Sequence, residues 1–268
     1  MLNIFEWNEP QIFTFFFVLI RVTSLIVVLP LFGDKTVPPM VKLFFALSFS
    51  FVAFPVAWGQ GVRVPRELFD APMRLTIAIV SDICFGLALG FVARWIFEAI
   101  HVAGYVAGTS MGFSMASVLD PHSETQAIAV AELQYIFSAL LFLSLEGHHI
   151  YLKVIIDSFA TLGPGAINLG AVSGDLSKYM IEMTAGVLGL GLKLAAPVLV
   201  VILLVNLIFG IMTRAVPQMN VMAVSFTANI MIGLFVSLVS FPGFLNMLGG
   251  AFENQASELL RFVRLFGG

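Results

Sequence analysis

Charged residues are scarce in this chain: they make up 11% of its 268 residues, whereas soluble domains carry about 25%. Hydrophobic residues make up 59%, and the mean hydropathy is +1.01. The chain therefore suits an apolar solvent, or burial on nearly all sides within an assembly. The net charge of −3 comes without a block of basic residues, which argues against nucleic acid as a partner.

Cysteine occurs once, at Cys84, so an internal disulfide is excluded. Because Cys84 lies in an apolar run, we expect it to be a small buried side chain. The positive start of a secretory signal is also lacking, since the N-terminal sequence MLNIFEWNEPQ carries Glu6 and Glu9 and no basic residue. The first apolar segment is therefore expected to remain in the mature protein.

Residue patterns for nucleotide, metal and catalytic sites are missing as well. Glycines precede Lys193, but Leu192 separates them from the lysine and Leu194 follows it, where a phosphate loop needs Gly-Lys-Ser/Thr. His148 and His149 are adjacent and would point about 100° apart on a helix, which suits shared metal coordination badly. We therefore expect no cofactor, no metal site and no enzymatic activity.

Long apolar runs dominate what is present, and a transmembrane helix needs about 20 such residues. These runs are too long for strands and show no strict alternation, so the predicted fold is all-α, a multi-helix apolar protein of the membrane type. A shorter run, Ile150–Leu162, contains Lys153 and Asp157 and is predicted to be a buried or interfacial helix. The candidate spans are Ile12–Leu31, Val41–Trp58, Leu75–Ile100, Ala127–Leu145, Ala185–Ile211 and Ala223–Leu248.

Loops are indicated where glycine, proline, serine and charged residues gather between the runs. The Gly- and Ser-rich stretch Leu162–Ser177 is the best candidate for a domain boundary. It would divide the chain into residues 1–177 and a two-helix hairpin at residues 178–268. The other predicted loops are Phe32–Met40, Gly59–Pro72, Ser110–Glu124 and Met212–Val221.

Several polar and ionisable side chains fall inside the predicted spans, where a charge at the bilayer centre costs about 2.5–3.5 kcal/mol on insertion scales. Arg94 and Glu98 are four residues apart and could pair along one helix face. Two interpretations stay open: a path for protons or ions, and structural pairing within the chain or between subunits. The residues concerned are Arg21, Asp82, Arg94, Glu98, Glu132, Lys193 and Asn206.

The stretch GYVAGTSMGFSMASVLDP, residues 104–121, has the most distinctive pattern. Gly104, Gly108 and Gly112 stand four apart, a spacing that lets another helix approach closely in an apolar protein. The run that follows has no charge and two methionines, which can repack when something moves, and Asp120-Pro121 indicates a turn. Ordinary core packing at a helix turn and a movable seal are both compatible with this composition.

The order of several motifs resembles the FliR family of flagellar export-gate proteins and its injectisome counterpart, SctT. The resemblance runs along nearly the whole chain, although each motif alone is weak. The family often has asparagine where this chain has Glu146. Whether Glu146 makes the contact that asparagine makes in the family is therefore in doubt. The motifs are Arg21 with Pro30, Phe32-Gly33, Pro38 and Lys42; Gly108 to Pro121; FLSLEGHHIYL at Phe142–Leu152; and Arg214 with Pro217-Gln218 and Asn220.

This resemblance implies a non-enzymatic subunit of a type III protein export gate. The motifs favour the flagellar system, and an injectisome export-gate subunit stays open as an alternative. It implies FliP-like and FliQ-like subunits, FlhB-like and FlhA-like export proteins and unfolded export substrates as partners. It further implies a FliP-like part, residues 1–177, fused to a FliQ-like hairpin, residues 178–268. The assembly would belong to the bacterial inner membrane and flagellar basal body, largely on the periplasmic side. A solute or ion permease is the alternative that the charged residues keep open.

Carried over to this chain, the family's pore plug comprises Ser110, Met111, Gly112, Phe113, Ser114, Met115 and Ala116, with Asp120-Pro121 at its end. Gly104 and Gly108 are then packing residues that position this plug. Charges inside the spans would pair at subunit contacts, for which the candidates are Arg21, Arg94, Glu98, Glu132, Lys193, Arg214, Gln218 and Asn220.

Overall fold

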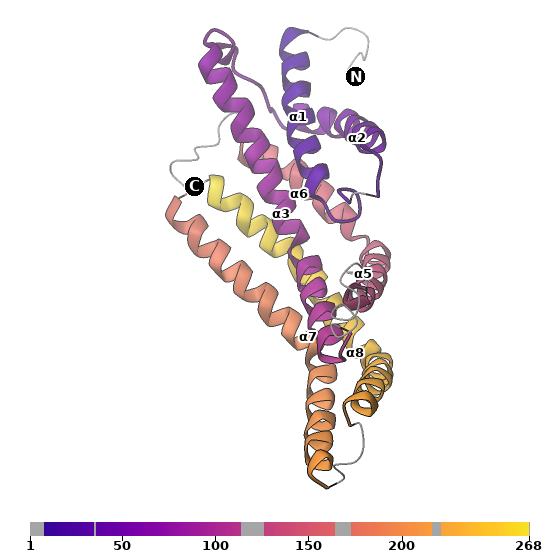
Figure 1. The fold of residues 1–268 in the computed structure, drawn as a ribbon. Helices are drawn as coiled ribbons and strands as arrows, with labels where there is room; N and C mark the ends of the chain where they lie inside the picture. Colours follow the sequence, from indigo (N-terminus) through magenta and orange to yellow (C-terminus); the bar gives the residue numbers. More distant parts are fainter. Residues whose placement is uncertain (1–7, 35, 114–125, 164–172, 216–220, 268) are drawn as a thin grey trace. The chain divides into compact units, whose positions relative to one another are not determined.

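A computed structural model describes residues 8–34, 36–113, 126–163, 173–215 and 221–267, and their regular structure is entirely helical. This confirms the predicted all-α membrane-type fold. The elements are α1 (Glu9–Val28), α2 (Pro39–Gly59), a 3-10 turn η1 (Arg66–Leu68), α3 (Pro72–Ser110), α5 (Gln126–Ser144), α6 (Gly147–Thr161), α7 (Ser173–Ala215) and α8 (Val221–Gly267), as Figure 1 shows.

The helices α3, α7 and α8 are much longer than the apolar runs that predicted them, with 39, 43 and 47 residues. Hydropathy identifies only the apolar part of each of these helices, whereas the helical backbone continues into more polar residues at the ends. The last part of the predicted loop at Leu162–Ser177 is thus helical, because α7 begins at Ser173. Within the described residues, five helices are long and apolar enough to cross a membrane, or six if α5 and α6 form one broken span.

The chain forms two compact units that are not consecutive in sequence. Unit 1 comprises Met1–Trp95, Glu146–Ile181 and Glu253–Gly268, and unit 2 comprises Ile96–Leu145 and Glu182–Phe252. The helices α3, α7 and α8 therefore each contribute to both units. These compact units are defined by contacts in space. The predicted division at residue 177 is defined instead by likeness to two protein families, and it stays a prediction.

A buried ion pair lies at the centre of unit 1. Arg21 of α1 and Asp82 of α3 are both 0% exposed, and Arg21 Nε donates to Asp82 Oδ1 at 2.7 Å. A second nitrogen of Arg21 donates to the same oxygen. The guanidinium also lies 4.0 Å from the centre of the Phe159 ring. Because a buried charge needs both a partner and satisfied hydrogen bonds, this pair ties α1 to α3.

Two further hydrogen bonds from Arg21 reach α6. The Nη1 atom donates to Ser158 Oγ at 3.2 Å and to the carbonyl of Leu162 at 3.0 Å. Leu162 directly follows the last residue of α6, where carbonyl groups lack helical partners. One side chain thus holds three helices together and completes the end of one of them.

The end of α8 joins unit 1 through a second polar cluster. The Tyr151 hydroxyl of α6 lies 2.6 Å from Gln255 Oε1 and 3.0 Å from the carbonyl of Ala93 in α3. Gln255 Nε2 donates to that same carbonyl at 2.8 Å. Both polar side chains are buried, so the cluster fixes the register of α8 against α3 and α6.

The connection between α1 and α2 explains the first sequence motif structurally. Lys42 Nζ donates to the carbonyl of Gly33 at 2.8 Å, and the Phe32 ring stacks on Phe45 with ring centres 4.7 Å apart. A β-carbon at Gly33 would lie 2.5 Å from the carbonyl oxygen of Val27, so only glycine fits there. These residues close a tight turn and stabilise it.

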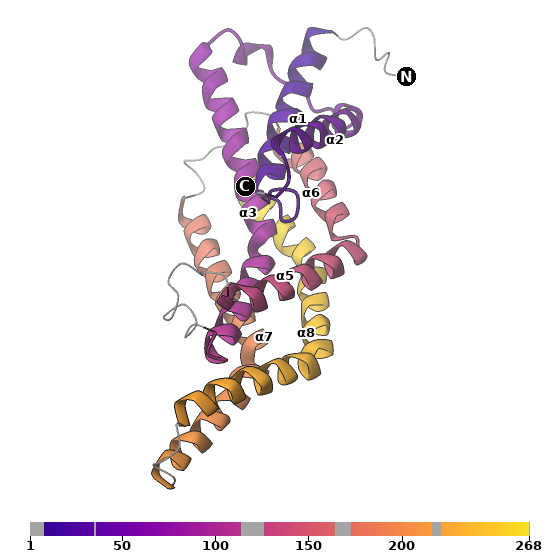
Figure 2. The same cartoon turned by 45° about the vertical axis from the view of Figure 1, so that its right-hand side comes forward.

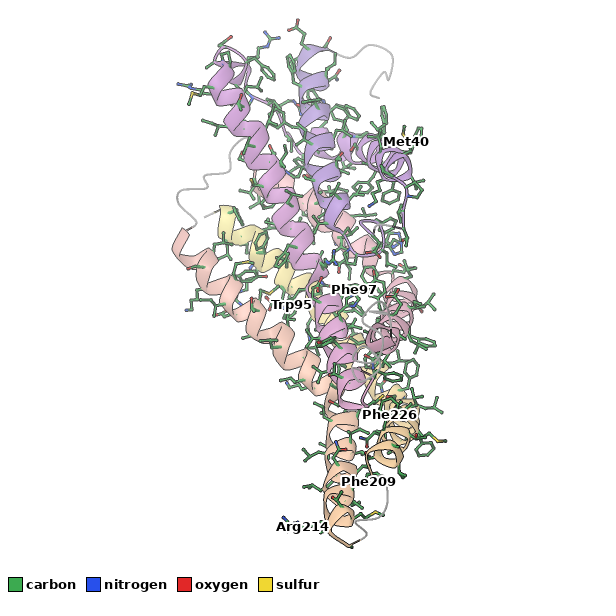
Figure 3. The ribbon with its side chains drawn as sticks, in the orientation of Figure 1. Met40, Trp95, Phe97, Phe209, Arg214 and Phe226 are labelled. Atoms are coloured by element: carbon green, nitrogen blue, oxygen red, sulfur yellow. The ribbon has the colours of Figure 1, made fainter. Side chains whose placement is uncertain are left out.

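The prediction that Cys84 is buried is wrong, because its side chain is exposed on α3. An apolar run indicates that a helix lies in apolar surroundings, but it does not indicate which face of the helix packs against the rest of the chain. Many large apolar side chains are exposed in the same way. Met40 on α2, labelled in Figure 3, is 68% exposed. The surface of the single chain is thus suited to lipid or to neighbouring subunits.

Removing one partner of the buried ion pair should destabilise the chain strongly. We expect Asp82→Ala to lower the free energy of unfolding by about 3–5 kcal/mol, because it leaves the Arg21 charge buried without its counter-ion. The double variant Arg21→Met with Asp82→Leu should recover much of this loss, since no charge stays buried. Thermal unfolding in detergent, followed by circular dichroism, measures both variants.

Arg74→Ala is the control, because Arg74 is exposed and its loss should leave the unfolding temperature nearly unchanged. An Asp82→Ala variant as stable as this control would contradict the role assigned to the pair.

Candidate functional site at the end of α3

Unit 2 is built around the second half of α3, which packs closely on α5. At Gly104 an added β-carbon would overlap with the backbone and side chain of Ala131 in α5. The missing side chain lets the two helix backbones approach. Figure 2 shows α5 leaving the neighbourhood of the end of α3. Gly104 is thus a contact residue that places α5 beside the segment predicted to act.

The end of α3 is a Schellman motif centred on Gly112. The Phe113 amide donates to the carbonyl of Gly108 at 3.2 Å, and the Gly112 amide donates to the carbonyl of Thr109 at 3.0 Å. Gly112 has φ +95°, a left-handed conformation that glycine adopts without strain. Such a motif satisfies the last carbonyls and stops a helix at a defined residue. The chain beyond Phe113 therefore starts from a fixed point.

Met111 anchors this turn in the core of unit 2. Its side chain is 0% exposed and packs with Ala107, Val198 and Ile202, with Val236 at the edge of the cluster. These residues come from α3, α7 and α8. On α8 this side chain also lies against Gly233, where an added β-carbon would lie 2.5 Å from Met111 Cγ. Met111 is thus a core residue in this structure.

An apolar cavity of about 370 Å³ adjoins the turn. Phe113 forms part of its wall and is half-buried. Two polar atoms of cavity-lining residues, Gln134 Oε1 on α5 and Ser237 Oγ on α8, are buried without a hydrogen-bond partner. The principal apolar wall residues are Val130, Leu133, Phe137, Leu194, Val198 and Phe241. The end of α3 therefore has unfilled apolar space beside it.

The structure divides the predicted plug into two portions. Ser110 is the last residue of α3 and its hydroxyl donates to the carbonyl of Val106 at 2.7 Å. Met111 and Gly112 form the core anchor and the helix stop, and Phe113 is the first residue beyond them. Ser114, Met115, Ala116, Asp120 and Pro121 lie outside the described residues, so their predicted roles stay predictions.

The predicted subunit-contact charges occupy different environments. Arg21 finds its counter-ion within the chain, because its partner is Asp82, so its charge is not presented to a neighbouring subunit here. Arg94 and Glu98 are half-buried on α3. The side chains of Glu132 on α5, Lys193 on α7 and Arg214 in the last turn of α7 are exposed, and Figure 3 labels Arg214. Gln218 and Asn220 lie outside the described residues.

Sequence reasoning missed three residues that shape this site, all on α8. Gly233 receives Met111, and the Phe226 ring would lie 3.2 Å from a β-carbon at Gly112. Asn229 Nδ2 donates to Asn206 Oδ1 of α7 at 2.8 Å, which links the two helices of the hairpin. The signal for Asn229 was a polar residue within an apolar run; for Gly233 it was a single small residue between large ones.

Residues 12–255 match the family model described as bacterial export proteins, family 1. The flagellar biosynthetic protein FliR of Escherichia coli is 30% identical over 233 residues, which cover 85% of this chain and 84% of that protein. FliR of Bacillus subtilis is 25% identical over 253 residues, covering 94% and 95%. FliR of Aquifex aeolicus is 23% identical over 261 residues, covering 97% of each.

The chain belongs to the FliR family of bacterial export proteins.

The match confirms the family resemblance seen in the motifs. In this FliR-family chain the matched region ends at Gln255, the residue that ties α8 to α3 and α6 in unit 1. The matched region also contains Met111, Gly112 and the residues of α8 that they contact. The family region thus covers both the buried polar networks and the candidate site.

Replacing the helix-stop glycine should loosen this site. We expect Gly112→Ala to lower the free energy of unfolding by about 1–2 kcal/mol, because alanine is strained in the left-handed region and its β-carbon would crowd Phe226. Amide hydrogen exchange at residues 112 and 113 should accelerate, since both amides donate in the motif.

The matched control is Gly189→Ala in α7, where an added β-carbon meets no atom within 4 Å. That variant should be as stable as the parent or more stable by up to about 1 kcal/mol. Equal exchange rates in the two variants would rule out the assigned role of Gly112.

Proposed function

We propose that this protein is a non-enzymatic core subunit of the flagellar type III protein export gate, which seals the pore and opens it for unfolded export substrates. The observation that carries the proposal is the FliR-family match over residues 12–255. The relatives' names refer to flagellar biosynthesis, and the sequence motifs favour the flagellar over the injectisome branch. The sequence contains no phosphate-loop pattern, so partners would supply the energy.

The proposed mechanism uses the segment from Ser110 to Pro121 as a plug. Ser110, Met111 and Gly112 are its fixed end, because a helix stop and a fully buried side chain hold them. Phe113 begins the part that blocks ions and small molecules until substrate arrives. The run Ser110–Leu119 carries no charge, which supports the role, since few strong bonds would have to break when the plug moves aside.

The proposed partners are FliP-like and FliQ-like subunits, together with FlhA-like and FlhB-like export proteins. Exposed apolar side chains on three helices support this, because such surfaces mark contacts with protein or membrane. Examples are Phe44 and Val52 on α2, Leu203 and Ile211 on α7, and Phe235 and Leu238 on α8, all more than half exposed. We place the assembled gate in the inner membrane and basal body, largely on the periplasmic side.

The proposed internal division into a FliP-like part, residues 1–177, and a FliQ-like hairpin, residues 178–268, has support of its own. The helices α7 and α8 are consecutive and long, with 43 and 47 residues. Their hydrogen bond between Asn206 and Asn229 joins them directly. A two-helix hairpin that follows a multi-helix part would have these properties.

A solute or ion permease is the second candidate, favoured by the exposed charges of Glu132 and Lys193 on apolar helices. Native mass measurement of the purified protein separates the two functions. A lone monomer or homodimer would favour the permease. Co-purification of defined numbers of FliP-like and FliQ-like subunits would favour the gate.

Deleting Met111–Ala116 should make the assembled gate leak. The expected result is a several-fold rise in ion flux across membranes that contain the complex, because the deletion removes both the anchor and the start of the plug. The measurement is a flux assay on complexes whose subunit composition is first verified. Wild-type flux through a complex of normal composition would refute the plug assignment.

A further inference from the structure

The hairpin of α7 and α8 carries a pair of amide side chains in apolar surroundings. Asn206 is the only polar residue between Lys193 and Thr213 in the sequence, and it accepts a hydrogen bond of 2.8 Å from Asn229 of α8. Asn229 is buried, with 8% of its surface exposed, whereas Asn206 is exposed. One amide therefore lies inside the hairpin and the other lies at its surface.

This hydrogen bond fixes the orientation of the exposed amide. It runs from Asn229 Nδ2 to Asn206 Oδ1. Asn229 Oδ1 has no hydrogen-bond partner in the described part of the chain, so Asn206 Nδ2 does not bond back to Asn229. An amide nitrogen has two hydrogens to donate, and in apolar surroundings a donor without an acceptor costs free energy. Asn206 therefore requires an acceptor that Asn229 does not provide.

Asn206 shares one face of α7 with a glycine that leaves open space. Leu203, Asn206, Leu207 and Gly210 stand at positions i, i+3, i+4 and i+7, a spacing that places them on the same face of a helix. All four are exposed. At Gly210 an added β-carbon would meet no atom of the chain within 4 Å. A second helix can bring its backbone close at such a position. We call these four residues the Asn206 face.

The opposite side of the same helix segment has a different composition. Leu204, Ile208 and Ile211 are exposed there, and all three are large and aliphatic. Lipid tails suit such a side, because they are apolar and offer no hydrogen-bond acceptor. The Asn206 face instead combines an amide with a glycine, and small and amide side chains are typical of contacts between helices in membranes. Composition thus separates a side suited to lipid from a side suited to protein.

We propose that the Asn206 face binds an apolar helix of a neighbouring subunit, which places a carbonyl or hydroxyl oxygen opposite Asn206 Nδ2 and its backbone against Gly210. Asn229 is a positioning residue, because it holds the Asn206 amide in the orientation that presents the donor. This inference rests on the proposed function, since the neighbour is another subunit of the same complex. It adds the surface that is bound and the chemistry of the contact.

Filling the open space at Gly210 is the first test, in the complete complex. Gly210→Leu should lower the amount of this chain recovered in the purified complex about tenfold, because overpacking an interface is costly. The unfolding temperature of the single chain in detergent should not fall. Gly243→Leu is the matched control, because Gly243 is also helical and exposed and an added β-carbon meets no atom within 4 Å. Equal recovery of the two variants would overturn the proposal.

A double variant separates contact with a neighbour from a role within the hairpin. Asn206→Leu combined with Asn229→Leu removes both amides, so no buried amide loses its partner and the single chain should unfold at about the parent temperature. Recovery in the complex should still fall about three- to tenfold, the effect of one lost hydrogen bond between helices in a membrane. Parent-level recovery of the double variant would show that the amides serve only the hairpin, and would refute the proposal.

Cross-linking identifies what covers the face. A photoreactive amino acid is placed at Leu207 or, as the control, at Leu204, which are 58% and 53% exposed, and the products in the purified complex are identified by mass spectrometry. Leu207 should yield a helical peptide of another subunit, and Leu204 should yield lipid. Lipid alone or a second copy of this chain at Leu207, in a complex that retains its other subunits, would overturn this inference and leave the gate proposal standing. A chain that purifies without any other subunit would refute both.

Discussion

Satisfying polar groups in an apolar chain is the constraint on which the rest of this structure depends. Water cannot repair an unpaired group in such surroundings, so a buried polar group without a partner in protein costs free energy. Arg21 meets this demand with Asp82, Ser158 and the carbonyl that follows α6. Tyr151 and Gln255 do the same around one carbonyl of α3. These few polar contacts fix which helices of unit 1 lie together, a choice that uniformly apolar faces leave open.

The same constraint explains the geometry at the end of α3. A helix that stops among apolar residues leaves carbonyls without partners, and the Schellman bonds to Gly108 and Thr109 satisfy two of them. The motif needs a left-handed residue, and Gly112 provides it. The stop is therefore sharp, and the buried side chain of Met111 holds it in place. The end of α3 is thus held by backbone geometry and by one buried side chain.

Family membership and packing lead to the same view of the chain as part of a larger body. Large apolar side chains are exposed on α2, α7 and α8. A chain of this kind gains its stability from what surrounds it as much as from its own core. A membrane or the other components of an export apparatus would provide those surroundings.

Particular elements show how far prediction from sequence reached. The start of α1 lies three residues before the predicted one, and Asn8 and Gln11 form a capping box on either side of Glu9 and Pro10. The start of α2 follows from its two prolines. The ends of α7 and α8 were underestimated, because polar helical turns carry no hydropathy signal. At the candidate site, the four-residue glycine spacing indicated a close helix approach, and Gly104 makes one with Ala131. Whether Met111 belonged to a core or to a seal could not be decided.

The sequence by itself determined the helical class, the apolar surroundings, the family and the place where α3 must stop, because composition, run length and glycine are local properties of the chain. Only the tertiary structure decided that Cys84 faces outward, that Arg21 pairs with Asp82, and that Gly233 receives Met111. The physical reason is the near-uniform hydrophobicity of the helices. When almost every face is apolar, periodicity does not mark the inner one, and packing between residues distant in sequence makes the choice.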